Sequence, residues 1–434
     1  MNPAALDAPA RGRRLVLRRG AAAALGCGVG PWVHHHAWAQ AAGKRPLRFG
    51  LTTDDTGQYA ASGQDEQRGI RMALAEANAR GGVLGRRIEI VHEDTAGNPE
   101  RAAEVAQRML TQHEVGFMVG AVHSGAASAI SKVAQQAGCI YFNTNSSSPT
   151  EAGKDCHRTK FVWDGNGTNF SISVVKGAMT GFGRDWVLIT SDYTWGHNTA
   201  KGIRALVESS GGRIVDELLV PQNALDFAPQ LEKIRKLKPG VVATAVGGDD
   251  LNLLRTQVRD AGLDRSFGWI NNQQDWPDVY GMGREKMFGI FGTTWYWGLP
   301  LSGVADFVAR YRQANPGYRI KTPGNVFYNG YMATRELLRA IERTGTTNNL
   351  KLIAELERLR VPASDRMQHH DAFMNPLTHQ LQQTVYIAAH NSRPSEPDDL
   401  FRILGRLRPE EVQDTASAAL CKLESLAATP VFEP

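Results

Sequence analysis

The stretch RFGLTTDDTGQYAASGQDEQRGIRMALAEANARGG (residues 48–82) decides the fold class, because a strand pattern runs directly into a helix pattern. Residues 48–53 are a short apolar run with turn residues behind it. Between residues 64 and 79, apolar side chains recur at spacings of three and four, which is typical of one buried face of a helix. Gly81 and Gly82 end that helix. The stretch therefore predicts a strand–helix unit of an α/β fold.

The same alternation of strand and helix patterns continues along the chain. Further strands are predicted at residues 87–92, 115–120, 139–143, 186–190, 213–220, 241–246, 267–270, 287–294 and 384–388. Further helices are predicted at residues 100–113, 124–137, 196–209, 226–237, 251–261, 304–314, 326–343 and 350–360. Such alternation indicates parallel sheets with helices on both faces. Because the strands are too many for one compact sheet, we expect two α/β lobes with a cleft between them.

The composition is that of an ordinary globular protein. Hydrophobic residues make up 42% of the 434 residues and charged residues 21%, which excludes a disordered chain and a collagen. No apolar run reaches the roughly 18 residues that a membrane-spanning helix needs. A polytopic membrane protein is therefore excluded as well.

The first 39 residues carry the pattern of an export signal. The motif RRLVLR begins at Arg13, a run of small residues follows, and Ala37-Trp38-Ala39 forms a cleavage motif. The twin arginine predicts a Tat-type signal peptide over residues 1–39 and a periplasmic location. The alternatives are a basic amphipathic helix and lipidation at Cys27. Since this leader carries +4 of the formal net charge of +5, the basic balance does not support a nucleic-acid partner.

Three cysteines remain after the leader. Cys139 lies in the apolar run GCIYF, so we expect a small buried side chain. Cys156 and Cys421 lie in polar surroundings, and an exported protein is oxidised, so we predict a disulfide between them. Three free thiols are the alternative. No cysteine or histidine spacing indicates zinc, and we expect neither a metal nor a cofactor.

Loops at the carboxyl ends of parallel strands form the ligand site in such folds, and here these loops are rich in hydroxyl and aromatic side chains. In the first half they are residues 54–63, HSGAAS with Ser124, and NTNSSSP with Ser146 and Ser148. Ser124 begins a predicted helix, where hydroxyls and free N–H groups suit an anion such as a carboxylate. Simple helix capping and turn formation are the alternative for each loop taken alone.

The second half of the chain supplies aromatic and acidic side chains at its strand ends. The loops SDYTWGH, GGDD, NNQQDW and TTWYWG contribute Trp195, Asp249, Gln273 and Tyr296 as candidates. Aromatic rings there can stack on a ligand, or they can pack in the core or at a hinge.

Enzyme motifs are poorly represented. Ser173 and Lys176 match S-x-x-K, but the K-T-G element is missing and Ser173 falls within a helical pattern. The G-x-S-x-G, H-E-x-x-H and phosphate-loop motifs are absent. We therefore expect a protein without catalysis and keep an exported serine hydrolase as an alternative.

The ordered set of motifs DDTGQYAASGQDEQRGIRMALAEANARGG, EIVHEDTAGNPERAAEVAQRML, VGAVHSGAASAI and ITSDYTWGHNTA resembles the type I periplasmic substrate-binding proteins of ABC importers, the leucine/isoleucine/valine-binding family. The resemblance runs from about Lys44 to the C-terminus. It implies two Rossmann-like lobes with parallel sheets, joined by three crossovers, and a ligand in the interlobe cleft. It also implies hinge closure on a small molecule and its delivery to the permease subunits of the transporter.

The resemblance assigns roles to individual residues. It implies that Ser124 grips a ligand carboxylate, helped by Ser146 and Ser148. Tyr59 and Trp195 are implied as aromatic contacts, and we expect Tyr296 to stack on the ligand as well. Asp249 is implied to line the cleft.

One position departs from the family pattern. Amino-acid binders of the family usually carry an acidic residue in the loop that matches NNQQD, to pair the ligand ammonium, and this chain has Gln273 there. Asp249 or Asp275 can substitute. The late cysteine and the tryptophan-rich loops resemble a subset associated with aromatic and other non-amino-acid carboxylates, so we favour such a ligand over an amino acid.

The sequence thus predicts a monomeric periplasmic solute-binding protein. The first lobe is expected at residues 44–162 plus 295–383, and the second at residues 163–294 plus 384–434, with a C-terminal extension. A ligand-sensing accessory protein that uses the same cleft is the second alternative.

Overall fold

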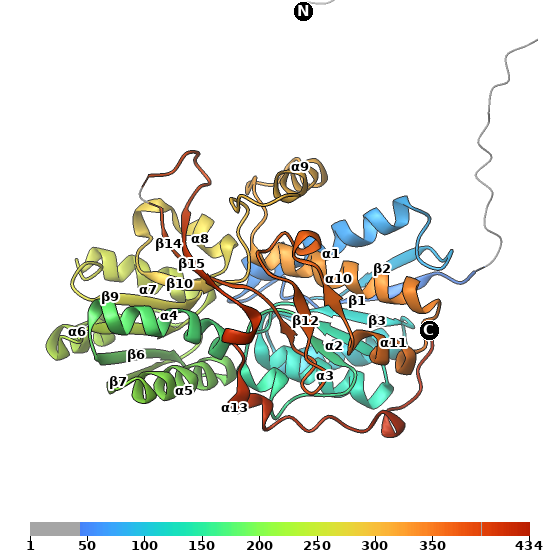
Figure 1. The fold of residues 1–434 in the computed structure, drawn as a ribbon, viewed down its shortest axis with the longest axis horizontal. Coiled ribbons are helices and arrows are strands. Elements are labelled where there is room, and N and C mark those ends of the chain that lie inside the picture. Colours follow the sequence, from blue (N-terminus) through green and yellow to red (C-terminus); the bar gives the residue numbers. More distant parts are fainter. Residues whose placement is uncertain (1–43, 392) are drawn as a thin grey trace, which may run out of the picture. The chain divides into compact units, whose positions relative to one another are not determined.

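The computed structural model describes residues 44–391 and 393–434, and the predicted leader, with Cys27, lies outside these residues. The described chain carries two large sheets (Figure 1). In the part that is described, no helix is both long and apolar enough to cross a membrane.

The first large sheet is fully parallel and has the strand order β2-β1-β3-β4-β5. Its strands are β1 (Leu47–Leu51), β2 (Ile88–His92), β3 (Phe117–Gly120), β4 (Ile140–Asn143) and β5 (Lys160–Val162). The helices between them are α1 (Ala60–Ala79), α2 (Pro99–Thr111), α3 (Ser124–Ala137) and the short η1 (Pro149–Ala152). Phe49, Phe117 and Phe142 on neighbouring strands are fully buried, so they form part of the core of this sheet.

The second large sheet has the order β15-β14-β10-β9-β8-β6-β7. Its parallel strands are β6 (Asp185–Ser191), β7 (Arg213–Val220), β8 (Val241–Ala245), β9 (Gly268–Gln273) and β10 (Ile290–Thr293). Two antiparallel strands, β14 (Val385–His390) and β15 (Phe401–Leu407), complete one edge. The accompanying helices are α4 (Gly167–Phe182), α5 (Thr194–Ser209), α6 (Ala228–Leu237), α7 (Gly248–Asp260), α8 (Trp276–Met282) and η2 (Arg284–Lys286).

After β10 the chain returns to the first sheet, which gives the crossed connections expected from the resemblance. Three helices follow: α9 (Val304–Ala314), α10 (Asn325–Thr344) and α11 (Asn349–Leu356). Helix α10 packs along α1, and the two lie side by side in Figure 1. A small antiparallel sheet then follows, with β11 (Arg360–Val361), α12 (Ala363–Arg366), β12 (Ala372–Met374) and β13 (Leu381–Gln382). The structure therefore confirms the predicted α/β class with parallel sheets.

The chain's last residues connect the two large sheets a further time. They contain η3 (Pro409–Glu411), α13 (Thr415–Ala418) and η4 (Leu426–Ala428). Near its start this segment is held by α4, since Asn169 Nδ2 donates to the carbonyl of Val412. Cys156 and Cys421 form a disulfide, and Cys139 is a buried free thiol. The segment that we assigned to the second lobe thus ends against elements of the first.

Both ends of the described chain meet at one side chain. Arg86 Nη1 donates to the carbonyl of Pro434 at 2.6 Å. The same guanidinium donates to the carbonyls of Arg45 at 2.8 Å and Pro46 at 3.2 Å. A single arginine therefore holds the first strand's entry and the C-terminus together.

Candidate ligand-binding site

One cavity lies where the carboxyl ends of the two large sheets face each other. Residues that follow strands of the five-stranded sheet form one side: Tyr59, Val122, Ser124, Asn145 and Ser147. The seven-stranded side supplies the others: Tyr193, Trp195, Gly247, Gly248, Leu251, Gln273, Asp275 and Asp278. The free volume is about 30 Å³, enough for a few water molecules. A larger ligand therefore requires the two sides to move apart or their side chains to move.

Direct hydrogen bonds hold the two sides of this cavity together. Gln58 Nε2, from the loop after β1, donates to the carbonyl of Gly247 at 2.9 Å and to Asp250 Oδ2 at 2.8 Å, both at the start of α7. The phenol oxygens of Tyr59 and Tyr193 lie 2.5 Å apart. The structure is thus a closed arrangement.

Ser124 lies at the first position of α3 and is almost fully buried. The helix is capped by His123, whose Nδ1 accepts from the N–H of Ala126 at 3.3 Å, and not by Ser124 itself. The Ser124 hydroxyl accepts from Ser146 Oγ at 3.1 Å. Since capping uses His123, the Ser124 side chain is left to line the cavity.

The serine run after β4 contributes different residues from those predicted. Asn145 and Ser147 line the cavity, whereas Ser146 and Ser148 do not. Ser148 caps η1 instead, accepting from the N–H of Thr150 at 3.4 Å. Side chains of an extended segment alternate between opposite sides, so a shift of one residue corrects the sequence assignment.

Behind Ser124 lies a buried ion pair. Ser146 Oγ lies 3.1 Å from Glu151 Oε1, and Glu151 Oε2 lies 2.7 Å from Lys160 Nζ. Ser146 thus supports Ser124 from behind, without reaching the cavity.

Aromatic side chains form one wall of the cavity. Tyr193 stacks on His123 with ring centroids 5.0 Å apart, and the centroid of Trp195 lies 6.1 Å from that of Tyr193. Trp195 Nε1 is buried and has no hydrogen-bond partner among the described residues. The predicted Tyr59 and Trp195 are therefore brought together, and Tyr193 joins them.

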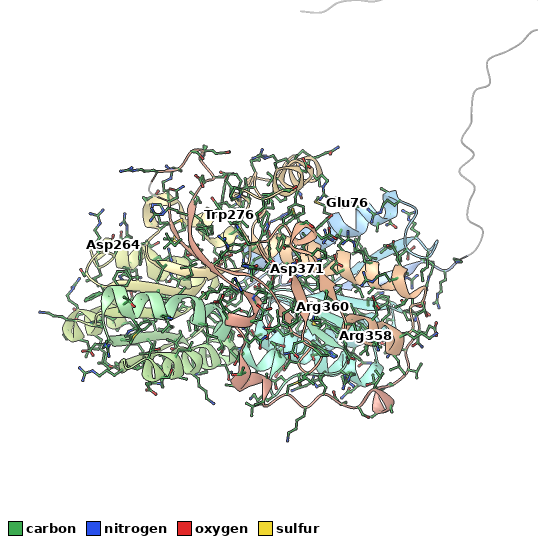
Figure 2. All side chains as sticks on the ribbon, viewed as in Figure 1. Glu76, Asp264, Trp276, Arg358, Arg360 and Asp371 are labelled. Carbon is green, nitrogen blue, oxygen red and sulfur yellow. A yellow bond between two sulfur atoms is a disulfide. The ribbon has the colours of Figure 1, made fainter. Side chains whose placement is uncertain are left out.

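Tyr296 and Asp249 lie outside the cavity. The Tyr296 ring packs against Trp276 and Phe401, and its hydroxyl donates to Asp399 Oδ1 at 2.9 Å; Trp276 is labelled in Figure 2. The chain is already crossing back to the first sheet at this point, which turns Tyr296 into the core. Asp249 is exposed in the first turn of α7, and only its backbone N–H, donating to the carbonyl of Gln58, takes part in the closed arrangement.

Gln273 lines the cavity as predicted by position, and two carboxylates stand beside it. Its Nε2 donates to Asp164 Oδ2 at 3.3 Å and to Asp275 Oδ1 at 3.4 Å. Asp275 also accepts from Asn325 Nδ2 at 3.0 Å. Burial raises the pKa of Asp275.

Asp278, in the first turn of α8, is a further cavity residue that sequence reasoning missed. Its side chain is 4% exposed and takes part in no hydrogen bond or ion pair found among the described residues. Burial, and then the nearby Asp275, raise the pKa of its carboxyl well above the usual range. The sequence DWPD, directly after a strand end, predicts a helix that begins at the binding edge of the sheet, and this pattern could have identified Asp278.

Two further buried carboxyls support the loops behind the cavity. Glu66 accepts from the N–H of Ala121 at 3.0 Å and from Asn145 Nδ2 at 2.8 Å, and burial raises its pKa to about 8. Asp164 accepts from Thr294 Oγ1 at 2.8 Å, and burial raises its pKa to about 7.

The alternative hydrolase pair does not form a catalytic arrangement. Ser173 is buried within α4 and donates to the carbonyl of Phe170 at 2.6 Å, whereas Lys176 is exposed. Among residues 44–391 and 393–434, no cluster of three or more His, Cys, Asp or Glu side chains could hold a metal ion.

Comparisons with known proteins agree with this fold. The family model described as periplasmic binding protein matches residues 46–394. A curated relative, Leu/Ile/Val-binding protein homolog 8 from Brucella abortus, is 23% identical over 280 residues, which cover 61% of this chain and 69% of the relative.

Solved structures share the architecture. A periplasmic binding protein from Burkholderia mallei superposes with a TM-score of 0.80 at 21% identity, covering 87% of this chain and 99% of the other. A solute-binding protein of an ABC transporter from Rhodopseudomonas palustris, in complex with 3,4-dihydroxybenzoic acid, gives a TM-score of 0.74 at 22% identity, covering 84% and 98%. The resemblance drawn from the sequence is confirmed: the chain belongs to the periplasmic binding protein family, with the type I fold of the ABC-transporter solute-binding proteins.

Proposed function

We propose that the chain is the periplasmic solute-binding component of an ABC importer. It captures a small solute in the cavity between the two large sheets and delivers it to the permease subunits. The observation that carries this proposal is the shared cavity, whose lining comes from both sheets and whose two sides are joined by Gln58. A ligand enclosed in this way contacts both sides at once, so its binding energy favours closure.

Export and assembly form part of the same proposal. We propose that residues 1–39 direct the chain to the periplasm by the Tat route and that it acts as a monomer without a nucleic-acid partner. The two lobes are taken as residues 44–162 plus 295–383 and residues 163–294 plus 384–434.

The sequence leaves two candidate classes of solute, amino acids and aromatic or other non-amino-acid carboxylates. A carboxylate, aromatic or from an amino acid, has the start of α3 with Ser124 in its favour. Against it, the cavity is lined by Asp275 and Asp278 and by no lysine or arginine. Burial raises the pKa of both carboxyls, and a ligand carboxylate would add a further acidic group without a basic partner. We therefore propose capture of a small polar solute rather than of an aromatic carboxylate.

A thermal-shift panel of amines, amino acids, aromatic acids, amides and alcohols tests solute capture. A ligand at about 100 times its Kd adds about 2.7 kcal/mol to the free energy of unfolding. Ligand-dependent compaction in small-angle scattering, together with uptake by membranes that carry the cognate permease, would support the transport role. A chain that shows no shift with any class would contradict it.

A further inference from the structure

The cavity is lined by two acidic side chains and by no lysine or arginine. Asp275 precedes α8 and Asp278 lies in its first turn, and both line the cavity. The charged groups that act on Asp278 are the carboxylates of Asp275, Asp249 and Asp65, and all of them raise its pKa. On α1, Arg68 is engaged by Asp65 at 3.2 Å.

The hydrogen-bond donors next to these carboxylates are already used inside the protein. Ser147 Oγ donates to Gln273 Oε1 at 2.7 Å. The Gln273 amide in turn donates to Asp164 and Asp275.

Asp275 accepts from Asn325 as well, and Ser62 Oγ donates to its other oxygen at 3.3 Å. Among the described residues, the acceptor oxygens left without a donor on this side are therefore those of Asp278. A ligand group that is rich in N–H donors satisfies them, and an ammonium group, which has three such donors, meets this need.

The aromatic side chains of the cavity suit a positive charge as well. Tyr59, Tyr193 and Trp195 line the same cavity as the two aspartates. The face of an aromatic ring attracts a cation held within about 6 Å of the ring centroid. Acidic and aromatic side chains in one cavity together form a receptor for a compact cation.

We propose that the solute is a small organic cation, an ammonium or amidinium compound, whose positive nitrogen lies between the carboxylates of Asp275 and Asp278. The proposal rests on the proposed function of solute capture and narrows it to one chemical class. A carboxylate ligand would add another acidic group to a cavity that no lysine or arginine lines. Burial and Asp275 raise the pKa of Asp278, so its carboxyl holds a proton in the solute-free cavity; a bound cation takes the place of that proton, whereas a carboxylate cannot.

The experiment is isothermal titration calorimetry on the purified exported chain. The probes are methylammonium, tetramethylammonium, guanidinium and acetamidinium chlorides, alanine and leucine, and sodium benzoate. We expect at least one cation to bind, and the anion and amino acids to bind more weakly than that cation or not at all.

The variant Asp278→Asn removes the charge with little change of shape, and its side chain has no partner to lose within the protein. We expect it to raise the Kd of the bound cation by at least about 30-fold, the effect of removing one partner of a buried charge pair. Asp260→Asn, at the exposed end of α7, is the matched control and leaves the Kd within about two-fold, as an exposed site with no ligand contact does. Circular dichroism melting shows whether both variants are folded.

The outcomes separate this proposal from the function on which it rests. Binding of benzoate or of an amino acid in preference to every cation overturns the cation class, while solute capture stands. An unchanged Kd for the cation in Asp278→Asn overturns the assigned position of the nitrogen. Absence of binding by every probe and by the wider solute panel overturns both.

Discussion

Gln58 Nε2 lies 2.8 Å from Asp250 Oδ2. This hydrogen bond joins the loop after β1 of the five-stranded sheet to α7, the helix that follows β8 of the seven-stranded sheet. The same amide also reaches the carbonyl of Gly247. One side chain therefore makes two of the contacts that hold the cavity closed.

Replacing Gln58 with alanine removes both contacts from the closed state and none from an open one. We expect the variant to bind solute about 5- to 100-fold more weakly, since each hydrogen bond contributes about 0.5–1.5 kcal/mol. Calorimetry measures the Kd, and small-angle scattering of the ligand-free chain should show a larger radius of gyration than in the wild type. An unaltered radius with an unaltered Kd would contradict the role of Gln58 in closure.

The one-residue register of the loop after β4 is testable with a pair of equivalent substitutions. Ser147→Ala removes a hydroxyl that lines the cavity, so we expect weaker solute binding with a nearly unchanged Tm. Ser148→Ala removes the cap of η1, so we expect a loss of about 0.5–2 kcal/mol in the free energy of unfolding with an unchanged Kd. If Ser148→Ala weakened binding and Ser147→Ala did not, the sequence assignment would be right and the structural one wrong.

Stability should fall as pH rises above about 6.5. Burial raises the pKa of Asp164 to about 7 and of Glu66 to about 8, and it raises that of Asp278 as well. Unfolded carboxyls titrate near pH 4, so between that pH and about 8 the folded chain holds more protons than the unfolded chain. The free energy of unfolding is then largest at the acidic side of this window and is lost as pH rises through the folded pKa values.

Melting curves at pH 6.5, 7.5 and 8.5 measure this effect. The series begins at pH 6.5 because burial lowers the pKa of His123, His157 and His379. Below that pH these histidines bind protons mainly in the unfolded chain, so they make the free energy of unfolding rise with pH. We expect Tm to fall across the series and the fall to be smaller in Asp278→Asn. A Tm that rises steadily to pH 8.5 would contradict the protonated state of these carboxyls.

The disulfide closes a very long loop. Cys156 and Cys421 are 265 positions apart, and the chain-entropy model gives an upper figure of about 5–6 kcal/mol for such a loop. We expect Cys421→Ser to lower Tm in scanning calorimetry and to leave the solute Kd within about two-fold, because neither cysteine lines the cavity. Cys139→Ser is a control for thiol chemistry, although burial of that side chain adds its own packing cost.

The alternation of strand and helix patterns in the sequence was sufficient to predict the parallel sheets and to locate the cavity at their carboxyl ends. Helix α1 begins four residues before the predicted one, at Ala60, since the small residues AASG of its first turn carry no large apolar side chain that would show the helical spacing. Strand β15 was missed although Phe401, Ile403 and Leu407 alternate, because an exposed edge strand lacks the continuous apolar run that marked the other strands.

The site was harder to predict at the level of single side chains. Strand ends located Tyr59, Ser124, Trp195 and Gln273 at the cavity, because the carboxyl ends of parallel strands meet at one edge. Tyr296 was predicted at the site but packs in the core. A strand pattern in the sequence does not show that the chain leaves the sheet directly after that strand. In the serine run, a one-residue shift reverses which side chains face the ligand, and composition cannot resolve it.

Arg86 has a practical consequence for engineering. Because its guanidinium bonds to Pro46 and Pro434 together, the two ends of the folded body can be joined by a short peptide, and new ends can be opened elsewhere. A circularly permuted chain with its break in the exposed loop at Leu225 would place a fluorescent reporter beside Gln222 and Asn223, whose hydrogen bonds to Gln58 and Asp250 form part of the closed arrangement. The protein thereby offers a scaffold for an optical sensor of its own solute.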